Sequence, residues 1–163
     1  MNRTSFIILA VLLLTVAGCV DKGAKPAPDA AVAEAESAAR QPASGTVQQL
    51  TAAAFRKNIM DYAADSARWQ YLGDRPAVID FYATWCGPCR SMTPIVEEAA
   101  KRYAGDVVFY KVDIDEETEL AQFFGIQSIP FFLFIPMQGT PSAQTGAMDA
   151  ESFDRMVREI VKP

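Results

Sequence analysis

From residue 46 onward, hydrophobic and polar positions follow the spacings of strands and helices in turn. Nearly continuous apolar runs indicate strands that are buried on both faces. Strands are predicted at 47–50, 77–83, 107–112, 131–135 and 143–145. The last of these follows a hairpin signal at 137–139 and is the weakest, because it holds few apolar side chains.

Between the strands the apolar spacing becomes helical. The clearest helix lies at the C-terminal end, where a spacing of three and four residues behind a capping aspartate joins Phe153, Met156, Val157, Ile160 and Val161. Further helices are predicted after a capping Thr51, over 88–103 with Gly105 at its end, and over 116–124 with Asp115 as its cap. This order of elements predicts an α/β fold with a central mixed sheet flanked by helices on both faces.

The first 45 residues lack this pattern and predict export and tethering. A positive start and an apolar stretch have the anatomy of a secretory signal peptide over residues 1–18. Its end, Val16-Ala17-Gly18-Cys19, resembles the lipobox of bacterial lipoproteins, which implies lipidation of Cys19; the alternative is an ordinary signal peptide. Residues 19–45 are rich in Ala and Pro and predict a lipid-anchored linker, so the folded domain is expected over 46–163.

Composition narrows the classes of function. The chain has a formal net charge of -5, and nucleic-acid phosphates favour basic surfaces, so nucleic acid is not an expected partner. The chain contains no histidine, which removes the commonest general base and the commonest metal ligand. Its three cysteines would need carboxylates to complete a zinc site, so no metal site is expected.

Cys86 and Cys89 stand three residues apart, where a buried strand gives way to a helix. This spacing lets their sulfur atoms reach disulfide distance. The positive amino end of a helix favours a thiolate, so Cys86 is expected to be exposed and nucleophilic, and Cys89 to be shielded and to resolve a mixed disulfide. Gly87 and Pro88 suit the first helical turn, where proline forfeits no needed hydrogen bond. By itself, such a pair is also typical of half a zinc site or of a static disulfide.

Residues elsewhere in the chain strengthen the redox interpretation. Asp80 lies inside a buried strand, where an unpaired carboxylate is costly, and this predicts a role in handling protons. Lys111 lies in the next buried strand, where its charge can compensate that carboxylate; alternatively, it is an edge lysine that reaches solvent. Pro130 stands at the head of the strand at 131–135, where a cis bond from Ile129 would fit it.

Residues 78–90, Val-Ile-Asp-Phe-Tyr-Ala-Thr-Trp-Cys-Gly-Pro-Cys-Arg, resemble the active-site segment of thioredoxins. Pro94 stands where thioredoxins kink the active-site helix, and 111–115 resembles their central strand and its exit. Ser128-Ile129-Pro130 is similar to their cis-proline loop, and Gly146-Ala147 precedes the final helix as in that family. The resemblance covers residues 46 to 163 and implies a thioredoxin fold.

The resemblance also implies roles for individual residues. Cys86 would be the attacking thiolate and Cys89 the resolving thiol. Asp80 would take the proton from Cys89, and Lys111 would tune Asp80. Trp85 would shield the site, and substrate contacts are expected at Trp85, Gly87, Pro88, Ile129 and Pro130. The chemistry would be thiol–disulfide exchange through a mixed disulfide, without a cofactor.

One segment departs from the family pattern. Residues 62–75, with Trp69 and Tyr71, are more numerous than their equivalent in a minimal thioredoxin. We interpret this segment as extra packing, with a docking surface as the alternative.

The predicted function is protein-disulfide reduction, because the Gly-Pro pair and the Asp80/Lys111 arrangement match reducing thioredoxins. The N-terminal signals predict that the protein lies in the cell envelope, lipid-anchored and facing the periplasm or the cell exterior. It is expected to be a monomer. Expected partners are disulfide-containing envelope proteins and a membrane electron donor, since a reductant outside the cytoplasm needs imported electrons. The alternatives are a dedicated reductant for cytochrome c maturation, a disulfide oxidant or isomerase, and a binding protein with a static Cys86–Cys89 disulfide.

Overall fold

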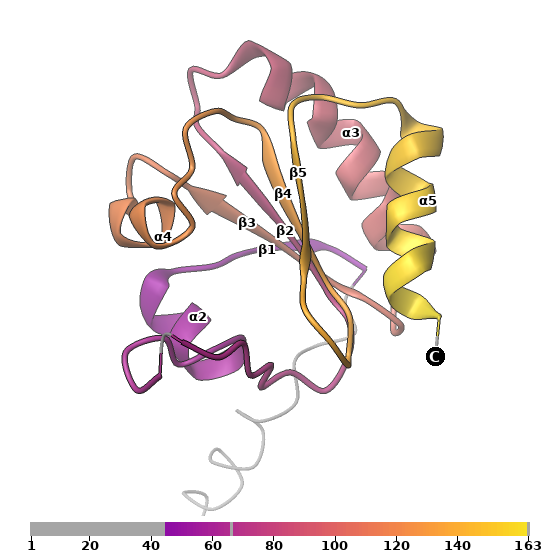
Figure 1. The fold of residues 1–163 in the computed structure, drawn as a ribbon. Helices are drawn as coiled ribbons and strands as arrows, with labels where there is room; N and C mark the ends of the chain where they lie inside the picture. The colour runs from indigo at the N-terminus through magenta and orange to yellow at the C-terminus, as the bar shows by residue number, and fades with distance from the viewer. Residues whose placement is uncertain (1–44, 66, 163) are drawn as a thin grey trace, which may run out of the picture.

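The predicted strands form one mixed sheet of five strands, in the spatial order β1-β3-β2-β4-β5 (Figure 1). Their bounds are β1 Val47–Gln49, β2 Ala77–Tyr82, β3 Val108–Asp113, β4 Phe131–Ile135 and β5 Ser142–Thr145. The computed structural model describes residues 45–65 and 67–162. The predicted signal peptide, the lipidation site at Cys19 and nearly all of the predicted linker lie outside these residues.

The strand register brings several chain segments to one edge of the sheet. β3 runs parallel to both β1 and β2, whereas β4 is antiparallel to β2 and β5 is antiparallel to β4. Tyr82 pairs with Asp113, Phe81 with Phe131, and Phe131 with Thr145. The ends of β2, β3 and β5 therefore meet the beginning of β4, and the loops that follow or precede these points are neighbours.

Helices cover both faces of the sheet, as predicted (Figure 1). Their bounds are α2 Ala52–Asn58, α3 Gly87–Arg102, α4 Thr118–Phe123 and α5 Ala150–Val161. Side chains alternate along β2, so Ile79 and Phe81 pack on the face covered by α2 and α4, while Val78 packs on the face covered by α3 and α5. Among the described residues, no helix is long and apolar enough to cross a membrane.

Aromatic side chains fill both cores. On the α5 side, the ring of Phe153 lies 5.4 Å from that of Phe132 and 5.6 Å from that of Phe134, measured between centroids, and all three side chains are fully buried. On the opposite side, Phe81 contacts the rings of Phe124 and Phe131 edge-on. These pairs contribute more than their buried area, because edge-on aromatic contacts are favourable in themselves.

Local signals set most helix boundaries as expected. The side chain of Thr51 accepts the N–H of Ala54 and caps α2, and that of Asp149 accepts the N–H of Ser152 and caps α5. α3 ends at its cap Tyr103 rather than at Gly105, which lies two residues beyond with a φ of +92°.

The expected cap at Asp115 is wrong. Glu117 occupies the N-cap position of α4, and its side chain caps the amino end of α2 instead, accepting the N–H of Ala52 at 2.9 Å. Asp115 lies in a tight turn in which its N–H donates to the carboxylate of Asp113. The carboxylate of Asp115 itself accepts a hydrogen bond from the indole N–H of Trp85. The turn delays the helix, which begins at Thr118.

The segment 62–75 contributes packing, as interpreted from the sequence. Tyr62, Trp69 and Tyr71 pack against the core on the α2 side, and Tyr62 stacks on Phe123. The hydroxyl of Tyr71 donates to the carbonyl of Arg75 and closes the turn that leads into β2.

Candidate active site

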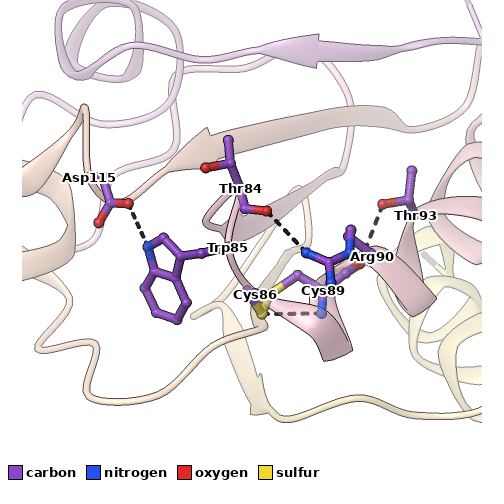
Figure 2. Close-up of a disulfide and its surroundings, with 7 residues drawn as sticks. All are labelled: Thr84, Trp85, Cys86, Cys89, Arg90, Thr93 and Asp115. Carbon is purple, nitrogen blue, oxygen red and sulfur yellow. Dashed lines mark hydrogen bonds between the residues drawn. A yellow bond between two sulfur atoms is a disulfide. The ribbon is translucent and has the colours of Figure 1, made fainter.

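The Cys-X-X-Cys segment lies where β2 ends and α3 begins, at the sheet edge described above. Cys86 and Cys89 form a disulfide with their Cα atoms 5.3 Å apart (Figure 2). Cys86 is the N-cap of α3, and its sulfur accepts the N–H of Cys89 at 3.2 Å. Pro88 lies in the first turn, where its missing N–H leaves no helical hydrogen bond unmade. The predicted pairing of the two cysteines is confirmed.

Both cysteines are buried in this oxidised form, each with 3% of its surface exposed. The prediction that Cys86 is exposed is therefore wrong for the disulfide, whereas Cys89 is shielded as expected. The sulfur of Cys86 is bonded to that of Cys89 in the first turn of α3, and the two cysteines form a buried cluster with Ala83 against which Ile129 packs.

Two polar contacts brace the loop before the disulfide (Figure 2). Trp85 is 65% exposed, and its indole N–H donates to the Asp115 carboxylate at 2.7 Å. The guanidinium of Arg90 donates to the carbonyl of Thr84 at 3.2 Å. The sequence pattern identified neither contact. Local rules assigned Asp115 to a helix cap instead of to Trp85. The parallel pairing of β2 with β3 is the signal that places Asp115 beside Trp85.

Asp80 and Lys111 pair in register on β2 and β3. Asp80 is 7% exposed, and its Oδ1 atom is buried without a hydrogen-bond partner in the described part of the chain. Burial raises the pKa of Asp80 to about 7, and the positive charge of Lys111 partly offsets that rise. The ammonium group of Lys111 lies 5.8 Å from the ring centroid of Tyr82, and no ion pair joins it to Asp80 among the described residues. Lys111 thus compensates the carboxylate through space and only in part.

A cavity of about 310 Å³ connects this pair with the resolving cysteine. Asp80, Cys89 and Lys111 all line it, together with Thr46 from the start of the domain and Glu97 from α3. The buried acid and the sulfur of Cys89 therefore share one space. Within residues 45–65 and 67–162, no group of three or more His, Cys, Asp or Glu side chains is placed to hold a metal ion.

The segment before β4 supplies the other side of the site. The Ile129–Pro130 peptide bond is cis, as the position of the proline suggested. Ile129 packs against the cluster of Ala83, Cys86 and Cys89, and the carbonyl of Pro130 accepts the N–H of Gly146 at 2.8 Å. The structure thus brings the predicted substrate-contacting residues together around the disulfide; their roles, like those of Asp80 and Lys111, stay predictions.

The sequence profile of the Thioredoxin family matches residues 46–159. The chain belongs to the thioredoxin family. It is similar to the thioredoxin of Borreliella burgdorferi, with 42% identity over 111 residues that span 68% of this chain and 94% of that protein.

Solved thioredoxins share the fold. A chloroplastic thioredoxin z superposes with a TM-score of 0.59 at 26% identity, over 71% of this chain and 94% of its own. The thioredoxin of Malassezia sympodialis gives the same TM-score at 31% identity, over 72% and 93%. The predicted thioredoxin fold is confirmed, and Cys86 and Cys89 are the redox pair of a thiol–disulfide oxidoreductase.

Proposed function

We propose that this thioredoxin is tethered to a membrane outside the cytoplasm and reduces disulfides of envelope proteins. The observation that supports thiol–disulfide exchange is the shared cavity, because an acid with a pKa near neutrality lies on the same space as the resolving thiol. Reduction rather than oxidation rests on the Gly-Pro pair and the Asp80/Lys111 arrangement, which match reducing thioredoxins. The tether rests on the sequence, through the signal peptide, the lipobox cysteine Cys19 and the linker that leads into β1. The electrons come from a membrane carrier, since cytoplasmic reductants do not reach that compartment.

The geometry supports a two-step exchange. The thiolate of Cys86 attacks one sulfur of the substrate disulfide, and the other substrate sulfur leaves as a thiolate. Asp80, ionised at that stage, accepts the proton of Cys89 through the shared cavity. The thiolate of Cys89 then attacks the sulfur of Cys86 and releases the second substrate thiolate. The substrate gains two electrons, and the enzyme is left with the Cys86–Cys89 disulfide of the structure.

Trapping of the mixed disulfide tests the substrate class. A Cys89→Ser variant of the full chain lacks the resolving thiol, so substrates should accumulate on Cys86. The Cys86→Ser variant is the matched control, since it removes the attacking sulfur and should capture none. Envelope proteins with paired cysteines support the proposal, whereas cytoplasmic partners contradict it. Captured apocytochromes c would instead indicate a dedicated reductant of cytochrome c maturation.

The direction of electron flow and the lipid tether are tested by separate experiments. The wild-type protein should reduce insulin and should stay largely oxidised when equilibrated with a glutathione buffer of oxidising composition, because a low reduction potential favours donation of electrons. A pair that remains mostly reduced in that buffer would show an oxidant and contradict the proposal.

A Cys19→Ala variant should leave the membrane fraction. Attachment that persists in this variant would exclude a lipid anchor at Cys19.

A further inference from the structure

A contact between the active-site helix and the loop before α5 supports a further inference, which rests on the proposed function. Met92 lies in α3, one helical turn beyond Cys89, and is 1% exposed. Its sulfur accepts the backbone N–H of Met148 at 3.3 Å. A thioether is a weak acceptor, but this partly buried N–H donates its hydrogen bond to it. A hydrocarbon side chain of similar size at residue 92 would leave that N–H without it.

The loop 146–148 is held at both of its ends. Its first residue, Gly146, donates its N–H to the carbonyl of Pro130 at 2.8 Å and has a φ of +91°, which favours glycine. Its last residue, Met148, donates to Met92. One end is thus joined to the cis-proline segment, and the other to the helix that begins with the redox cysteines.

This loop lies beside the disulfide. β5 ends at Thr145, which pairs with Phe131, the residue after Pro130. Ile129, on the other side of that proline, packs against the buried cluster of Ala83, Cys86 and Cys89. The loop crosses from β5 to α5 at the end of the sheet where α3 begins (Figure 1), and Ala147 at its centre is exposed. The loop and the exposed Trp85 therefore both lie close to the redox pair.

We propose that Met92 is a positioning residue for polypeptide substrates. Through its sulfur it holds the loop 146–148 against the cis-proline segment and thereby shapes one wall of the surface beside Cys86. A small disulfide needs only to reach Cys86, whereas a polypeptide also lies along the flanking backbone. Met92 therefore speeds the reaction with protein substrates but does not affect the exchange chemistry itself.

The test is a Met92→Leu variant of the full chain, which preserves side-chain volume and removes the acceptor. The reduced variant is mixed with insulin and with 5,5′-dithiobis(2-nitrobenzoate), and the rate constants are compared with those of the wild type. The rate with insulin should fall about three- to tenfold, as expected for the loss of one weak positioning hydrogen bond. The rate with the small disulfide should stay within about twofold, which also shows that the active site is intact. The amide of Met148 should exchange its hydrogen faster.

Met60→Leu is the matched control. Met60 is also buried, at 3% exposure, but it packs in the core on the α2 side. The control should leave both rates and the Met148 amide unchanged. Equal slowing with insulin and with the small disulfide, or an unchanged insulin rate, would overturn the role of Met92. A wild-type protein that does not reduce insulin would instead overturn the proposed function, so the two failures are distinguishable.

Discussion

Replacing Asp80 with asparagine should stabilise the oxidised protein above neutral pH and leave its stability in acid nearly unchanged. Asparagine has almost the same shape as aspartate but cannot ionise. The carboxylate that it removes is buried, has no ion pair with Lys111 and, among residues 45–65 and 67–162, has no hydrogen-bond partner at Oδ1. The wild-type fold therefore bears the cost of a buried charge whenever Asp80 is ionised.

The size of the effect follows from the pKa of Asp80. Burial raises this pKa from 3.8 to about 7 in the folded protein, whereas the unfolded chain keeps the ordinary value. Below the ordinary value, Asp80 is protonated in both states, so ionisation costs the fold nothing. Between the two values only the unfolded chain releases the proton, so stability falls as the pH rises. Above the folded pKa the loss levels off at about 4 kcal/mol, because one pKa unit corresponds to about 1.4 kcal/mol.

Urea unfolding at a series of pH values measures the effect. The free energy of unfolding of Asp80→Asn should equal that of the wild type at about pH 3 and exceed it by about 2 to 4 kcal/mol at about pH 8. The lower bound allows for an asparagine amide that also lacks partners.

Asp154→Asn is the matched control with the opposite sign. Hydrogen bonds from Tyr103 and Arg102 hold the pKa of Asp154 below its usual value, so its charge stabilises the fold at neutral pH. That stability is lost as the pH falls through the folded pKa. The control should be less stable than the wild type at neutral pH and should approach it in acid. An Asp80→Asn variant that is equally stabilised at all pH values, or destabilised at about pH 8, would refute the electrostatic reasoning.

Two further predictions concern neighbours of the site and the core. Lys111→Met removes a charge that lowers the pKa of Asp80, so the infrared carboxyl signal that disappears in Asp80→Asn should titrate at higher pH; an unchanged midpoint would mean that Lys111 does not act on Asp80. Phe153→Ala empties a fully buried position between Phe132 and Phe134 and should cost about 3 to 5 kcal/mol of unfolding free energy in urea, whereas Val161→Ala, at a position 38% exposed on the same helix, should cost less than about 1.

Strands and helices were predictable where a local pattern and the tertiary fold agree. β2 and β4 are buried on both faces, and their continuous apolar runs located them nearly to the residue. β3 begins one residue later than its apolar run, because the N–H of Val107 bonds the carbonyl of Tyr103 and extends the turn after α3. Such a shift depends on a contact that the hydrophobic pattern does not encode.

The candidate site was predictable in its residues but not in its contacts. Asp80 and Lys111 could be expected to lie side by side, because they occupy matching positions in neighbouring strands. Asp115 was misassigned, because a capping rule describes only the next few residues, whereas its partner Trp85 lies 30 positions away. The hydrogen bond between Met92 and Met148 spans 56 positions and has a backbone donor, so no pattern of side chains predicts it.

The strand order also determines how the domain carries a mechanical load. β1 is the first described strand of the chain, yet it lies at the edge of the sheet and pairs only with β3. A force applied through the N-terminal segment therefore loads the short β1–β3 ladder first, and shears its three residue pairs together when it acts along the strands. β2, which leads into the redox cysteines, is the central strand of the sheet and is held by both β3 and β4. Tension on a tether would detach β1 before it disturbed the disulfide.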